Sequence, residues 1–119
     1  MQPTVLCLGM EEGKKMRLSF LAASLGLAFR TAGAERGGAT LGMLCGADPA
    51  GCAVPGDIPG EMLVMAFLSD AQMDRLLRGM RESGCAVPLK AALTACNRFW
   101  TPRQLYHELV KEAAFFSGR

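Results

Sequence analysis

Apolar residues follow one another without interruption in two short stretches of the chain, a pattern typical of strands that are buried on both faces. The stretches are residues 4–8 and 62–67. Each precedes a segment with apolar residues at helical spacing and a closing glycine, so helices are predicted to end near Gly26 and Gly84. The two halves of the chain therefore repeat one order of elements about 58 residues apart, judged by these two glycines.

A second strand is predicted after each helix, at residues 27–31 and 87–93. Pro88 lies in the later strand and cannot donate a hydrogen bond to a sheet ladder, so we expect this strand at a sheet edge. A last helix is predicted from Thr101 onwards. Its apolar stripe consists of Leu105, Leu109, Ala113 and Phe116.

Two helix starts carry a capping box, in which a hydroxyl residue and a glutamine three positions later bond each other's backbone amides. The pairs are Ser69 with Gln72 and Thr101 with Gln104. Proline follows Thr101 at the first helical position, which it favours. These two starts are the best-specified boundaries in the sequence.

Two β-α-β units and a terminal helix predict an α+β fold, a ferredoxin-like βαββαβ sandwich with an added C-terminal helix. Its first and third strands are central, in keeping with their apolar runs, while Arg30 and Lys90 suit edge strands. A parallel, flavodoxin-like α/β sheet is the alternative, since helices on both faces also explain apolar strands. The 119 residues fit one domain. Residues 33–60, with eight of the fourteen glycines, are expected to form an irregular insertion with a short helix near 39–45.

Charge and composition exclude several classes of partner. Half of the residues are hydrophobic and the formal net charge is +2, with five basic and five acidic residues in 1–60 and eight and six in 61–119. This bias is too weak to predict binding to a nucleic acid or an anionic membrane. The longest apolar stretch, 18–29, is shorter than the ~20 residues that span a bilayer, and no cationic segment opens the chain. We therefore expect a soluble cytoplasmic protein.

Candidate metal, nucleotide and redox sites all fail on spacing. Cys45 and Cys52 share a glycine-rich segment, but six intervening residues is not a zinc spacing, and the odd number of cysteines suits a reducing compartment. The stretch 9–15 is one residue short of a phosphate-binding loop and has Lys15 in place of the metal-binding hydroxyl. His107, the only histidine, has no nucleophile placed beside it by any motif. We expect neither a cofactor nor a metal.

The segment from residue 90 to residue 100 is the candidate site, because loops at strand ends commonly carry function. Its candidate ligand-binding or partner-binding residues are Lys90, Thr94, Asn97, Arg98 and Trp100. Two hypotheses remain open. One is a non-enzymatic binding or regulatory module that presents this edge to a protein or small molecule. The other is a small enzyme that uses Lys90 with Thr94 or Asn97. The absence of an acid–base or nucleophile constellation favours the module.

The same region resembles a bacterial, mostly clostridial, family of uncharacterised small proteins that is filed as a domain of unknown function. The stretches LSDAQMDRLLRGMRESG and VPLKAALTACNRFWTPRQLYHEL carry the resemblance, over about the last 60 residues. Positions that match the family pattern are Lys90, Thr94, Asn97, Trp100, Thr101, Leu105 and Glu108. The resemblance implies no activity, because the family has none assigned.

The uninterrupted apolar strands also bear on assembly. Helices on one face of the sheet leave apolar side chains of both central strands on the other face, and exposure of each would forgo roughly 1.5–3 kcal/mol. The terminal helix or a second subunit can cover them. A helix of about 16 residues is roughly 24 Å long, too short to cover a whole sheet. We therefore expect a homodimer with the terminal helix at or beside its interface.

Overall fold

The computed structural model describes residues 2–32, 41, 45 and 60–117. The elements follow one another as β1 (Thr4–Leu8), α1 (Glu12–Ser24), β2 (Ala28–Ala32), β3 (Met62–Ala66), α3 (Asp70–Glu82), β4 (Lys90–Ala92), a 3₁₀ turn η2 (Asn97–Phe99) and α4 (Pro102–Ser117). All seven helices and strands predicted around these positions are present. The predicted helix near 39–45 falls almost entirely outside the described residues, as does Cys52.

The four strands form one mixed sheet in the order β2-β1-β3-β4. β1 pairs parallel to β2, β3 pairs parallel to β4, and the two central strands are antiparallel, with Leu6 opposite Val64. The predicted α+β class and the central and edge positions of the strands are confirmed. The ferredoxin-like topology is not, because there another strand lies between the two that a helix joins, whereas here they are neighbours. The antiparallel centre likewise rules out the wholly parallel alternative.

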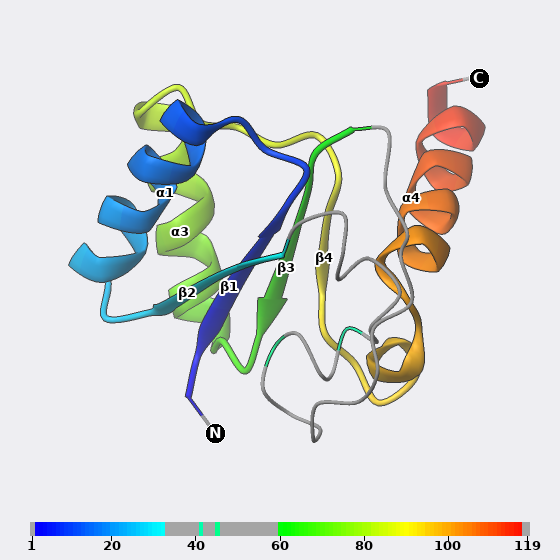
Figure 1. Ribbon diagram of the computed structural model, residues 1–119, viewed down its shortest axis with the longest axis horizontal. Coiled ribbons are helices and arrows are strands. Elements are labelled where there is room, and N and C mark those ends of the chain that lie inside the picture. Colours follow the sequence, from blue (N-terminus) through cyan, green and yellow to red (C-terminus); the bar gives the residue numbers. More distant parts are fainter. Residues whose placement is uncertain (1, 33–40, 42–44, 46–59, 118–119) are drawn as a thin grey trace.

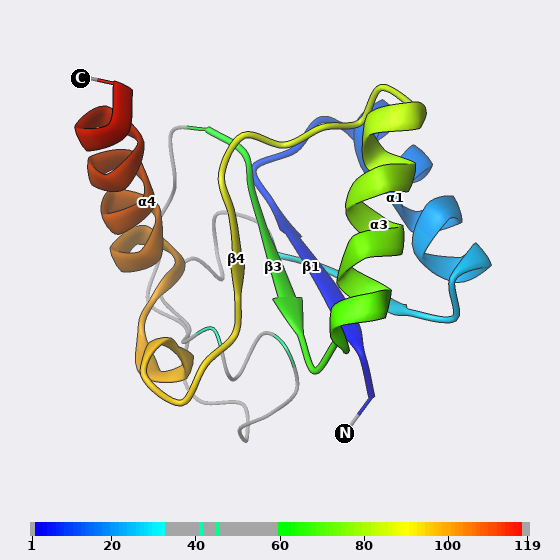
Figure 2. The same ribbon diagram turned by 180° about the vertical axis from the view of Figure 1, so that it is seen from behind.

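Helices cover both faces of the sheet (Figures 1 and 2). α1 and α3 lie together on one face, where Leu18 and Leu76 are fully buried against Val5 and Leu63 of the central strands. Residues of β1 and β3 therefore alternate between two apolar cores, which is why their sequences are apolar apart from Thr4 and show no polar alternation. The sheet is thus the middle of three layers.

α4 lies on the opposite face (Figures 1 and 2), together with Leu41 and Cys45. Leu105 of α4 is buried in this second core, and Leu109 and Trp100 pack against it. Residues of the same chain, with the terminal helix among them, therefore cover the apolar side chains of this face, and the homodimer stays a prediction. Of the predicted stripe of α4, the side chains of Ala113 and Phe116 lie outside the described residues.

Local chemistry sets the element boundaries. Gly26 and Gly84 follow their helices with φ of 74° and 71°, a left-handed conformation that glycine adopts without strain. Both predicted capping boxes are formed. The strand predicted at 87–93 is limited to Lys90–Ala92, although Leu89 and Leu93 on either side still share a hydrogen bond with β3. Phe67, directly after β3, also has a positive φ, 64°, which is unusual for an aromatic residue.

Candidate functional site

Two of the predicted site residues hold each other in a tight turn after β4. The backbone amide of Thr94 donates to Asn97 Oδ1 at 2.8 Å, and the amide of Asn97 donates to Thr94 Oγ1 at 3.0 Å. This reciprocal pair has the form of a capping box. It places the short turn η2 at the end of the sheet.

Asn97 also completes the edge of β4. Its side-chain amide nitrogen, Nδ2, donates to the carbonyl of Ala92 at 3.0 Å, and Asn97 as a whole is 8% exposed. Neighbouring bonds from Leu63 to Leu89 and from Leu93 to Met65 show that the odd-numbered residues of this region face β3. Ala92 therefore points its carbonyl away from the sheet, and Asn97 occupies the place of a further strand. The Asn97 side chain therefore has a structural role in this turn.

Lys90 lies apart from this turn. Lys90 is exposed, and its ammonium group donates to the carbonyl of Val87 at 2.6 Å. Three of the five predicted residues are thus engaged with the backbone of their own neighbourhood. The structure does not gather Lys90, Thr94 and Asn97 into one open pocket.

Arg98 and Thr94 line a small hollow of about 160 Å³ at the ends of β3 and β4. Leu93, Ala95 and Phe67 complete its wall. The Arg98 guanidinium lies over the ring of Phe99, 5.3 Å from its centroid, a cation–π geometry. Phe67 forms this wall from its left-handed backbone conformation.

Trp100 lines a larger hollow of about 350 Å³ with residues of α4. The other three are Gln104, His107 and Glu108. They lie on one flank of the helix because positions three and four apart are neighbours on a helical surface. Sequence reasoning assigned Trp100 to the candidate site but missed this flank, although the spacing from Gln104 to His107 and Glu108 was visible. His107 is exposed, and its ring meets that of Tyr106 edge-on.

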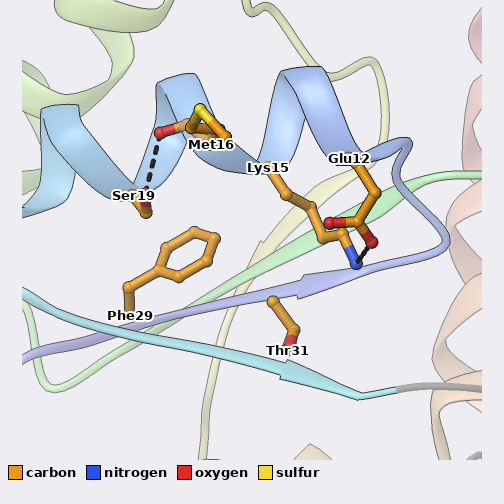
Figure 3. A pocket seen from close by; sticks show the side chains of 6 residues that line it. All are labelled: Glu12, Lys15, Met16, Ser19, Phe29 and Thr31. Carbon is orange, nitrogen blue, oxygen red and sulfur yellow. Dashed lines mark hydrogen bonds and ion pairs between the residues drawn. The ribbon is translucent and has the colours of Figure 1, made fainter.

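A third hollow, open and about 300 Å³ in volume, lies between α1 and β2 (Figure 3). Phe29 and Thr31 of β2 point towards the helix, and Glu12 bonds Lys15 at 2.7 Å above them. Met16 and Ser19 complete the lining. Glu12 and Lys15 belong to the stretch 9–15 that the sequence excluded as a phosphate-binding loop, and no motif pointed to the other four lining residues.

The described cysteines are free thiols, and three of the four are buried. Burial raises the pKa of Cys7 from 9.0 to about 12, against the opposing charge of Lys15. Burial likewise raises the pKa of Cys45 to about 11, although Arg30 lowers it in part. These thiols are poor nucleophiles at neutral pH. Within residues 2–32, 41, 45 and 60–117, no three His, Cys, Asp or Glu side chains come together to hold a metal, and no helix has the length and apolarity needed to cross a membrane.

The comparisons with known proteins add a single finding. No curated protein and no solved structure matches the chain. The model of one family does match, over residues 61–116, which comprise β3, α3, β4, η2 and most of α4. This half of the molecule, with the turn at Asn97 and the hollow at Trp100, is thus similar to the family described as domain of unknown function DUF3783.

Proposed function

We propose that this protein is a non-enzymatic binding module that takes a small organic cation into the hollow at Trp100. The observation that carries the proposal is the placement of the Trp100 indole and the Glu108 carboxylate around one open hollow. An aromatic face attracts a cation through its quadrupole, by about 0.5–2 kcal/mol depending on desolvation. A carboxylate adds charge attraction, so the two groups together favour an ammonium or a similar ligand.

Several features of the structure support a fixed geometry at this hollow. Trp100 is half-buried and packs against the second core, so its ring is held rather than mobile in solvent. The capping box of Thr101 and Gln104 fixes the start of α4 beside it, with the Thr101 amide 2.8 Å from Gln104 Oε1. Within the described part of the chain, Glu108 forms an ion pair with the exposed Lys111, at 3.3 Å. Such a surface ion pair contributes little, and a ligand cation can replace it.

The enzyme hypothesis has weaker support. It relied on Lys90 with Thr94 or Asn97, and each of these side chains bonds a backbone group of its own neighbourhood. Asn97 is also almost fully buried. A binding role needs none of these groups to be free. A cytoplasmic location and the bacterial, mostly clostridial, distribution implied by the resemblance belong to this proposal as expectations.

Titration with tetramethylammonium chloride tests the proposal, with sodium chloride at equal ionic strength as the control. Trp100 is the only tryptophan, so its fluorescence reports on the hollow directly. We expect a saturable change with tetramethylammonium alone. Glu108→Gln should weaken binding by roughly tenfold, about 1.4 kcal/mol. Glu112→Gln, an equal loss of charge at an exposed position outside the hollow, is the matched control and should bind as the unmodified protein does.

Lys111→Gln should strengthen the binding, because it removes the cation that competes for Glu108. A fluorescence response that is equal for both salts, or that Glu108→Gln and Glu112→Gln alter alike, would contradict the proposed site.

A further inference from the structure

The two helices on the first face of the sheet differ in the residues that they expose. The outer residues of α3 are charged, among them Asp74, Arg75 and Arg78. α1 instead exposes Met16 and Phe20, which are 60% and 69% accessible. These two residues are four positions apart and so lie on one flank of the helix. This flank borders β2, where Phe29 is half-buried in the open hollow of Figure 3.

The outer edge of β2, beside this apolar flank, has no backbone partner among the residues that the structure describes. Ala28 donates its amide to the carbonyl of Pro3, on the β1 side, at 2.9 Å. Successive residues of a strand direct their backbone groups to opposite sides, so Phe29 and Thr31 direct theirs away from β1. No described residue bonds to these outward groups. The other edge strand is different, because the Asn97 side chain bonds the outward carbonyl of Ala92.

We propose that β2 pairs antiparallel with β2 of a second copy of the chain, so that two sheets join into one across a two-fold axis. Phe29 lies opposite Phe29 of the second copy in this arrangement, and each donates its amide to the other's carbonyl. Thr31 then faces Leu27 of the second copy. The amide of Leu27 bonds Ala22, at 2.9 Å, so its carbonyl is the group that receives the Thr31 amide.

Side-chain charge selects this register over its neighbours. A shift by one residue in each strand places Arg30 directly opposite Arg30 of the second copy, and like charges at that position destabilise a pair. A further shift places Thr31 opposite itself and separates the two aromatic rings. The proposed register instead sets Arg30 opposite Ala28 and pairs the Phe29 rings, which cross-strand packing favours. The apolar residues Met16, Phe20 and Phe29 of both copies then meet on one face.

The helices fit the same symmetry. α1 connects β1 to β2, and a helix that crosses between these strands lies about one strand spacing, roughly 4.8 Å, from the proposed axis. Two copies of α1 are then roughly 10 Å apart, close to the 8–10 Å at which helices pack. Met16 and Phe20 lie on the flank that faces the axis. This interface is distinct from the face under α4 and is independent of the hollow at Trp100.

Sedimentation analysis of the full chain tests the proposal, and we expect a concentration-dependent dimer. Thr31→Pro should abolish it while the chain remains folded, because the lost amide hydrogen points away from β1. Phe20→Lys should raise the dissociation constant by at least roughly tenfold. Phe99→Lys is the matched control, since Phe99 is 66% exposed on another surface, and it should leave the dimer intact.

Oxidative cross-linking tests the register, in a chain with Cys52 and Cys96 replaced by serine. Phe29→Cys should form a disulfide between copies, since opposed hydrogen-bonded residues have Cα atoms about 5.5 Å apart. Arg30→Cys should not, because its position faces Ala28. A monomer at all concentrations, a dimer that survives both Thr31→Pro and Phe20→Lys, or cross-linking through position 30 in place of 29 would each overturn the proposal.

Discussion

Thr94 and Asn97 bond each other's backbone amides across a single turn, at 2.8 and 3.0 Å. Asn97→Ala should remove the acceptor of the Thr94 amide and the donor to Ala92, leaving two polar groups without their partners. Thr94 is exposed and Ala92 is half-buried, so each lost bond costs the ordinary net amount of about 0.5–1.5 kcal/mol. We expect Asn97→Ala to lower the free energy of unfolding by roughly 1–3 kcal/mol in total, measured by urea denaturation. Thr94→Ser keeps the hydroxyl and should lose much less, so equal losses would show that the pair does not act as described.

The cap of α4 offers a second measurement. The backbone amide of Gln104 donates to Thr101 Oγ1 at 3.3 Å, so Thr101→Ala should lower the free energy of unfolding by about 1 kcal/mol. Ser69→Ala at the start of α3 removes the equivalent bond, from Gln72 at 3.2 Å, and should lose a similar amount. Thermal denaturation of both variants, with Thr101→Ser as the conservative control, compares the two caps. An unchanged melting temperature for Thr101→Ala would exclude a stabilising role for the cap.

The left-handed backbone at Phe67 predicts an inverted order of two substitutions. Both Phe67→Ala and Phe67→Gly remove the ring, but only glycine adopts φ of 64° without strain. Alanine in this conformation is strained by roughly 1–2 kcal/mol, which outweighs the entropy that glycine loses on folding. We expect the glycine variant to be at least as stable as the alanine variant in urea denaturation. A glycine variant less stable than the alanine one by about 1 kcal/mol, the usual order, would contradict this conformation.

The buried thiols predict a loss of stability in alkali. The pKa of Cys7 is raised from 9.0 in the unfolded chain to about 12 in the folded protein, so the unfolded chain releases its proton first as the pH rises. The contribution of the Cys7 thiol to the free energy of unfolding is complete below pH 9. Above pH 9 it declines by about 1.4 kcal/mol per pH unit until the pKa of the folded protein is reached. Cys7→Val should flatten the dependence between pH 9 and 11, measured by urea denaturation under reducing conditions. Cys45, with a pKa of about 11, should add a shorter decline.

Thiol labelling of the native protein should separate the cysteines by exposure. Cys96 is exposed, whereas Cys7, Cys45 and Cys85 are buried, so a thiol reagent at neutral pH should modify Cys96 much faster than these three. Mass spectrometry after tryptic digestion assigns each site. Rapid labelling of Cys85, which is fully buried, would show that the core around α3 opens more readily than its packing indicates.

The apolar runs of β1 and β3 identified the central strands in advance, because a strand covered on both faces has no polar side to reveal. Gly26, Gly84 and the two capping boxes marked helix ends through purely local chemistry. Strand pairing was not accessible in the same way. The order β-α-β is shared by several topologies, and the residues between β2 and β3 are numerous enough to permit more than one return path. Nothing local to Leu6 specifies that Val64 lies opposite it and runs the other way.

The candidate site, too, was predictable from the sequence only where local features determine it. Asn97 was a candidate because it lies in the loop that follows a predicted strand. Its bond to Ala92, however, depends on β4 being an edge whose carbonyl faces outwards. The grouping of Trp100 with His107 and Glu108 depends on how the helix leaves the turn. The exposed flank of α1 escaped notice because Met16 and Phe20 read as ordinary helix residues until the position of β2 was known.

The antiparallel contact between the two halves has a consequence for the rate of folding. Within each half the paired strands are close in sequence, with Leu6 and Arg30 only 24 residues apart, whereas Leu6 and Val64 are 58 apart. Closing the longer loop costs about 0.8 kcal/mol more in chain entropy, since the cost rises with the logarithm of loop length. Each half can therefore form its local contacts before the central strands meet. Substitutions at the β1–β3 contact should then act mainly on the later docking step, and those within one half on the earlier one.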